Sequence, residues 1–236
     1  MPLVFEDEDG NVHESLHAVF EELPLFGHLY LNMQAQNIAL TDIDLREMEG
    51  SLLREYIQME RTPLMSAMRV SAWSQMWVFA FYELMRTWRQ RAKEVRDYAS
   101  ALQKSADPEG TKAEFREKFA RAAQLSRTAE VFDLHPFEEA EDAPAEMIGR
   151  IERASEIVEP LFRRLEAIRM TLAKHEVPKT RGMPATAPGY GRIDLSTGSI
   201  YWMIDYKDGT SDIISRRGLA DELSELLPLL RIEDRI

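Results

Sequence analysis

Apolar residues recur every three or four positions through most of this chain, a spacing that places them on one face of a helix. The longest such segment predicts a helix from Leu64 to Ser105, about 60 Å long at a rise of about 1.5 Å per residue. Its centre, Trp-Val-Phe-Ala-Phe-Tyr, is apolar on almost every side, so the helix is expected to be buried on most sides and to form the spine of the fold. Its apolar stripe comprises Val70, Trp73, Trp77, Ala80, Leu84, Trp88, Ala92, Val95, Ala99 and Leu102.

Capping residues and prolines divide the rest of the pattern into shorter helices. One is predicted to begin near Thr41 or Asp42, whose side chains can cap free amides, and to end before Pro63. Thr111 opens another helix with a capping-box pattern. The acidic residues 131–143 are expected to form a loop.

Two prolines organise the next helical segment. Pro144 fits a first helical turn, and Pro160 is expected to kink or restart the helix. The stretch Pro160–Pro178 is then predicted to be one helix bounded by proline at each end. Its buried stripe is Leu161, Leu165, Ile168 and Leu172.

The periodicity changes to two after residue 191, which is typical of strands. Three strands are predicted at 192–196, 199–206 and 210–215, joined by the hairpin signals Thr197-Gly198 and Asp208-Gly209. Ile200, Trp202 and Ile204 share the face expected to pack on the helices, and a leucine-rich amphipathic helix follows. The expected fold is mainly α: a helical bundle with a small C-terminal antiparallel β-meander and a final helix. We expect an acidic leader and irregular segment at 1–40, the bundle at 41–177, and the loop, meander and last helix at 178–236.

Composition narrows the possible functions. The 236 residues include no cysteine, which excludes disulfides, thiolate metal sites and cysteine nucleophiles. The first residues lack a signal-peptide pattern and no stretch reaches about 18 uninterrupted apolar residues, so the expectation is a cytoplasmic protein without membrane partners. A net charge of −12 argues against a large nucleic-acid surface.

Charge is unevenly distributed along the chain. Residues 1–60 carry 2 basic and 13 acidic side chains, whereas residues 61–130 carry 13 basic and 8 acidic ones. The cations of the long helix gather at Arg86, Arg89, Arg91, Lys93 and Arg96. They form either a solvated face whose basic stems cover the core or a phosphate-facing surface.

His13-Glu14-Ser15-Leu16-His17 matches the zinc-protease pattern H-E-x-x-H. On a helix the two histidines would share a face and could bind zinc, with Glu14 as the general base. Phe20 and Leu23 stand where a metzincin would have glycine and histidine. The alternatives are a zinc-dependent hydrolase, with its third ligand elsewhere, and a surface helix whose histidines are coincidental.

Arg169 and His175 flank the buried stripe near the end of the Pro160–Pro178 helix. Arg169 lies about 70° to one side of the stripe and His175 about 50° to the other. A guanidinium binds phosphate oxygens and an imidazole titrates near neutral pH, so the pair suits phosphate chemistry. The alternative is that Arg169 pairs with Glu166 or another carboxylate while His175 caps the helix end.

An arginine and a histidine separated by five residues, near the end of a helix in a helical bundle, resemble the R-x(4–6)-H motif of the HEPN (higher eukaryotes and prokaryotes nucleotide-binding) superfamily. The resemblance spans about residues 41–177. It implies metal-independent RNA cleavage at a homodimer interface, with His175 as the general base and Arg169 holding the phosphate. Arg164, Lys174 and Lys179 are then candidate substrate-binding residues.

This resemblance implies no cofactor and leaves two functions open. One is the ribonuclease, with RNA or a nucleotide as ligand and an antitoxin as a possible protein partner. The other is a non-catalytic sensor or interaction module on the same helical scaffold.

Overall fold

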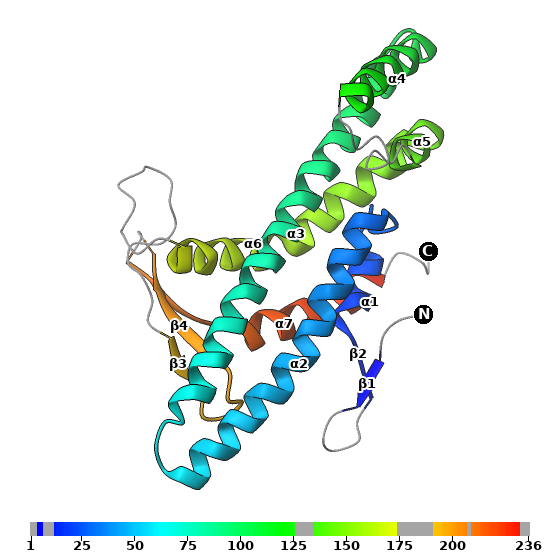
Figure 1. Ribbon diagram of the computed structural model, residues 1–236. Coiled ribbons are helices and arrows are strands. Elements are labelled where there is room, and N and C mark those ends of the chain that lie inside the picture. The colour runs from blue at the N-terminus through cyan, green and yellow to red at the C-terminus, as the bar shows by residue number, and fades with distance from the viewer. Residues whose placement is uncertain (1–3, 7–11, 126–134, 174–190, 207–208, 232–236) are drawn as a thin grey trace.

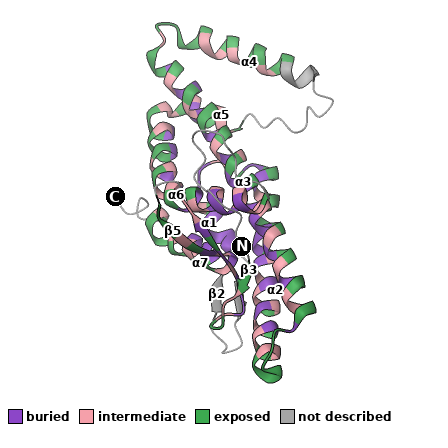
Figure 2. Ribbon diagram, turned by 90° about the vertical axis from the view of Figure 1, so that its left-hand side faces the viewer, coloured by how far each residue is buried: buried purple, intermediate pink, exposed green. Residues whose placement is uncertain are grey.

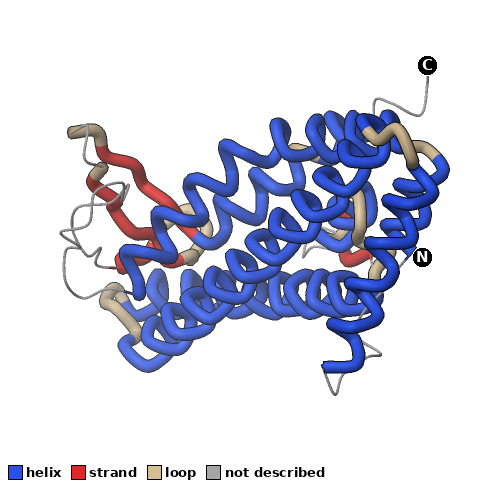
Figure 3. Tube along the Cα trace, turned by 90° about the horizontal axis from the view of Figure 1, so that it is seen from above, coloured by secondary structure: helices blue, strands red, loops and turns tan. Residues whose placement is uncertain are grey.

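Three long helices determine the shape of the protein in the computed structural model, which describes residues 4–6, 12–125, 135–173, 191–206 and 209–231 (Figure 1). The predicted fold class, a helical bundle with a small antiparallel sheet and a final helix, is confirmed. Figure 3 shows the three-stranded sheet at one end of the bundle. In chain order the elements are β1 (Val4–Glu6), β2 (Val12–Glu14), α1 (Leu16–Glu22), α2 (Leu29–Met59), α3 (Leu64–Lys104), α4 (Pro108–Leu125), α5 (His135–Asp142), α6 (Pro144–Ala173), β3 (Gly191–Ile193), β4 (Ile200–Asp205), β5 (Ser211–Ser215), α7 (Arg216–Glu225) and α8 (Leu227–Leu230).

Helix α3 is the spine that the sequence predicts, and α2 and α6 pack along it. Two of its tryptophans are fully buried and tie it to other elements. The Trp77 indole donates to the Ile38 carbonyl at 3.0 Å, and the Trp88 indole donates to the Pro24 carbonyl at 2.8 Å. Their burial and their hydrogen bonds fit a role in the core.

The predicted start of the second long helix is wrong. Helix α2 begins at Leu29, where the His28 side chain caps it by accepting from the Tyr30 amide at 3.2 Å. Residues 29–40, expected to be irregular, continue into 41–59 without a break. Asp42, predicted as a possible cap, lies inside the helix within a buried stripe. This stripe also comprises Leu31, Ala35, Ile38, Leu45, Glu49 and Leu52.

Two further boundaries differ from the prediction. Residues 135–142, expected in a loop, form helix α5. Helix α6 continues across Pro160, and Figure 1 shows that its two halves run in different directions. Proline removes one helical hydrogen bond, which permits a bend without ending the helix. Figure 2 shows α4 extending away from the body, and its residues 108–121 are all exposed or half-buried.

The meander has strand order β3-β4-β5, with both pairs antiparallel. Ile200, Trp202 and Ile204 are buried, as their alternation predicts, and their side of the sheet faces α6 and α7. The final helix is present as α7 followed by the short α8. The connection before β4 brings Gly198, at φ +77°, against the backbone of Glu49 in α2.

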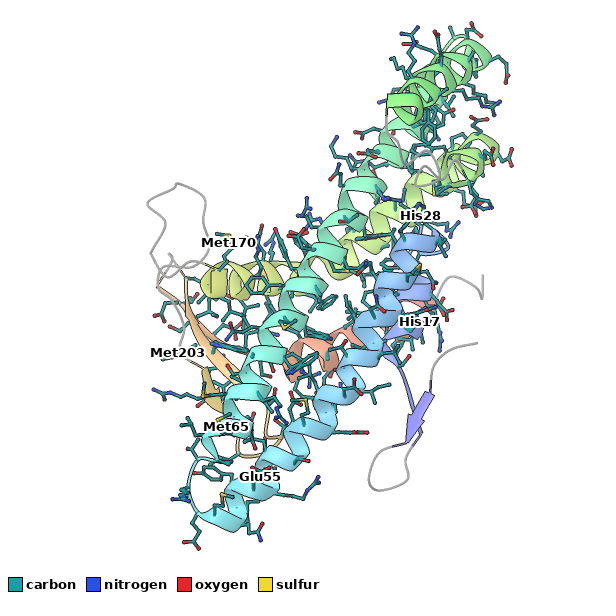
Figure 4. The ribbon with its side chains drawn as sticks, in the orientation of Figure 1. His17, His28, Glu55, Met65, Met170 and Met203 are labelled. Carbon is teal, nitrogen blue, oxygen red and sulfur yellow. The ribbon has the colours of Figure 1, made fainter. Side chains whose placement is uncertain are left out.

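The centre of α3, residues 77–82, is buried on most sides as predicted, but one face of the helix is uncovered. Trp73 is 45% exposed and Met76 is 62% exposed, although Trp77 beside them is buried. Met65, which Figure 4 labels near the lower end of α3, is 75% exposed. We call the following residues the α3 face: Arg69, Ala72, Trp73, Met76, Phe79, Ala80 and Glu83, all exposed except the half-buried Phe79.

Candidate functional site

Arg169 lies on α6 where this helix packs against α3. Its guanidinium carbon stands 5.1 Å from the centroid of the Tyr82 ring, and Nη2 lies 4.0 Å from Oε1 of Glu83. Its Nε is buried and donates no hydrogen bond to any described residue. The carboxylate beside Arg169 is thus on α3, and one guanidinium donor is left for an acceptor that the described residues do not provide.

Where α3 packs against α6, two arginines and two aromatic rings lie in a row, with Arg169 at one end and Arg89 at the other. The rings of Tyr82 and Phe162 stack at 5.7 Å, and Arg89 covers Phe162 at 4.2 Å. Burial raises the pKa of Tyr82, and the negative charge of Glu166 raises it further. The phenol therefore stays protonated at neutral pH and serves as a platform for the guanidinium.

Of the other predicted site residues, the structure describes only Arg164, whose ion pairs lie elsewhere. Arg164 points to β5 and α7, where Nε donates to Asp212 at 3.0 Å and Nη1 pairs with Glu222. Both carboxylates are half-exposed and fix Arg164 as a link between α6 and the C-terminal elements. Lys174, His175 and Lys179 lie outside the described residues.

The two histidines of the H-E-x-x-H pattern do not lie on one helix, as the zinc site would require. His13 and Glu14 belong to strand β2, whereas His17 belongs to helix α1, so the pattern spans two elements. His17 is buried, with Nε2 3.4 Å from the Asn32 side chain. Over the described ranges, no group of three histidine, aspartate or glutamate side chains is arranged to hold a metal ion.

The basic run of α3 consists mostly of paired side chains. Arg86 pairs with Glu83 at 2.8 Å, Arg89 with Glu159 at 2.9 Å, and Asp97 with Lys93 at 2.6 Å and Arg96 at 3.1 Å. These contacts favour the solvated face over the phosphate-facing surface. Arg91 differs from the others, because its partner is the imidazole of His28.

A buried charge cluster is the feature that sequence reasoning missed. Arg216, with 0% exposure at the start of α7, pairs with Asp42 and with both oxygens of Glu49, at 3.1 and 2.5 Å. Arg46 donates to Asp42 at 2.8 Å and to Asp221 at 2.7 Å. The signal in the sequence is the two carboxylates within the apolar stripe of α2, which require a buried cation.

The same cluster extends to the surface through Arg217. Its Nη1 lies 3.4 Å from Oε2 of Glu49. Burial lowers the pKa of Arg217, and repulsion from Arg46 lowers it further. The three arginines and three carboxylates balance in charge, so the cluster joins α2 to α7 and has no excess charge with which to attract a ligand.

Comparison with protein-family models, with curated proteins and with solved structures found no match to this chain. No helix within the described ranges has the length and apolar character required to cross a membrane. The HEPN resemblance stays a prediction that rests on its motif alone.

Proposed function

We propose that this chain is a non-catalytic helical interaction module that self-associates through the α3 face. The observation that carries the proposal is the exposure of large apolar side chains on the central helix, with Met76 62% exposed and Trp73 45% exposed. Contiguous exposed apolar surface of this kind marks protein interaction sites. A second copy of this chain is the partner that the face fits best.

The α3 face is complementary to itself in an antiparallel pairing centred on Met76. Arg69 and Glu83 each lie seven residues from Met76, on nearly the same side of the helix. A two-fold axis at Met76 therefore sets Arg69 of one copy opposite Glu83 of the other, twice. The same axis pairs Ala72 with Ala80, whose small side chains let the helices approach closely.

The aromatic residues follow the same symmetry. Trp73 and Phe79 each lie three residues from Met76, so each would meet the other across the axis. Among the described residues Arg69 has no ion-pair partner, while Glu83 is 48% exposed beside Arg86. An isologous interface needs one patch that carries both halves of each contact, and the α3 face carries them.

Met76→Glu is expected to dissociate the dimer, because it places two carboxylates against each other at the axis. The dissociation constant should rise on the order of a hundredfold or more. Light scattering after size exclusion should give the wild type twice the 27.2 kDa mass of one chain and the variant a single chain. Met203→Glu is the control, since it adds the same charge at a 52% exposed site on β4.

Charge-reversal variants test whether Arg69 of one copy pairs with Glu83 of the other. Arg69→Glu or Glu83→Arg alone should weaken association, and the double variant should restore it. A wild type that remains monomeric at the highest soluble concentration, or a double variant no better than the single ones, would overturn the proposal.

A metal-independent ribonuclease is the second candidate. It is favoured by Nε of Arg169, which has no hydrogen-bond partner among the described residues and so leaves a donor for a phosphate oxygen. In the antiparallel α3 pairing, the two Glu83 side chains beside the Arg169 residues lie about 20 Å apart along the helices. A cleft that contains Arg169 of both copies would therefore need a different dimer interface. The two candidate functions thus predict different dimers.

The ribonuclease predicts cleavage of RNA in EDTA that disappears in His175→Ala while the thermal unfolding curve is unchanged. His135→Ala is the matched control, because His135 is an exposed histidine on α5. Cleavage that survives in His175→Ala would exclude His175 as the general base.

A further inference from the structure

A cavity of about 750 Å³ lies between α3, α4, α5 and the start of α2. This volume falls within the range of pockets that hold small molecules, roughly 300–1,000 Å³. Its lining comes from residues 87–98 of α3, whereas the α3 face comprises residues 69–83. What binds in the cavity is therefore independent of self-association through that face.

One wall of the cavity is aromatic. Phe115 of α4 stands 4.1 Å from Tyr98 of α3 and 4.7 Å from Phe137 of α5, measured between ring centroids, and Phe119 adjoins them. The Tyr98 hydroxyl donates to Glu141 at 2.7 Å, which holds the ring in place. Burial raises the pKa of Tyr98, and this hydrogen bond raises it further, so the ring stays neutral. This wall suits an apolar body.

Arg91 and His28 form a polar site in the same cavity. Nη1 of Arg91 lies 2.7 Å from Nε2 of His28, which is 4% exposed at the N-terminus of α2. Figure 4 shows His28 at the end of α2 nearest to α5. No carboxylate lies within ion-pair distance of Arg91 in the part of the chain that the structure describes, although the other cations of its run are paired.

The Arg91 guanidinium supplies hydrogen-bond donors to this site. Arginine only donates, and among the described residues the partner of Arg91 is the His28 imidazole. An anion bound beside Arg91 would accept from its guanidinium, and the positive end of the α2 dipole would favour it.

We propose that this cavity binds a small amphipathic monoanion, a carboxylate on an apolar body. The carboxylate would accept from the Arg91 guanidinium, and the body would lie against Phe115 and the rings beside it. Glu94 and Asp97 also line the cavity, so a dianion such as a phosphate monoester would be repelled more strongly than a monoanion. One guanidinium without a carboxylate partner matches a single negative charge.

Titration calorimetry with decanoate and decan-1-ol tests this assignment, since the two share their chain length and differ in charge. Decanoate should bind one to one and roughly tenfold to a hundredfold more tightly than the alcohol. Arg91→Gln should remove that difference by weakening decanoate alone. Arg163→Gln, which replaces an exposed cation on α6 that pairs with Glu159 outside the cavity, should leave both affinities unchanged.

Equal affinities for the acid and the alcohol, or no binding of decanoate to the wild type, would overturn the proposal without any variant. Unchanged decanoate binding in Arg91→Gln would overturn the role of Arg91. The Met76→Glu monomer should keep its decanoate affinity, so failure of the interface and failure of the pocket give different results.

Discussion

Replacing Arg216 by methionine is expected to lower the free energy of unfolding by about 3–5 kcal/mol. The variant leaves Asp42 and Glu49, which are 1% and 0% exposed, without the guanidinium that neutralises them. Arg46 still pairs with Asp42 and Arg217 still lies 3.4 Å from Glu49, but the two carboxylates lose the one fully buried cation that they share. Urea denaturation of wild type and variant, followed by circular dichroism, measures the difference.

Two controls separate a buried charge effect from a general loss of charge. Arg121→Gln breaks an ion pair with Glu117 on α4 that is exposed on both sides, and should change stability by about 1 kcal/mol or less. Asp42→Asn and Glu49→Gln combined with Arg216→Met should recover part of the loss, because no buried charge remains. A single Arg216→Met variant as stable as the wild type would show that the cluster contributes little.

Replacing Gly198 by alanine is expected to destabilise the protein by about 2–4 kcal/mol. Gly198 has φ +77°, and a Cβ there would stand 2.0 Å from the backbone oxygen of Glu49 and 3.2 Å from Cβ of Leu53. The oxygen belongs to the backbone of α2 and cannot move aside alone. The variant must separate the sheet from α2 or bend the turn before β4.

Gly209→Ala is the matched control for the backbone conformation. Gly209 has φ +87° but no atom within 4 Å of an added Cβ, so its cost should be limited to the left-handed backbone, about 1–2 kcal/mol. The difference between the two variants in chemical denaturation measures the close contact with α2. Equal losses of stability in the two variants would show that the contact between Gly198 and α2 adjusts to the new Cβ without a measurable cost.

Local patterns determined most of the secondary structure. The spacing of apolar residues in α3 and the alternation in β4 are properties of a single element, and these predictions agree with the structure within a residue or two. The start of α2 was missed because Asp42 suits a helix cap, whereas it lies inside the helix with a buried side chain. Arg216, the partner of Asp42 and Glu49, is 174 and 167 residues away in sequence, so the local pattern does not identify it.

The candidate sites depended even more on the tertiary structure. The spacing predicts that Trp73 and Trp77 are equally buried, yet only Trp77 lies where α2 covers α3, as its bond to Ile38 shows. Arg89 and Arg91 likewise belong to one basic run, but Glu159 of α6 reaches only the first.

The sequence by itself therefore determined α3, the meander and the candidate Arg169, since each follows from a short-range pattern. Only the tertiary structure decided which face of α3 stays uncovered and that Arg91, unlike Arg89, has no carboxylate partner among the described residues. The physical reason is that burial and ion pairing depend on the neighbours that packing supplies, and those neighbours come from distant parts of the chain.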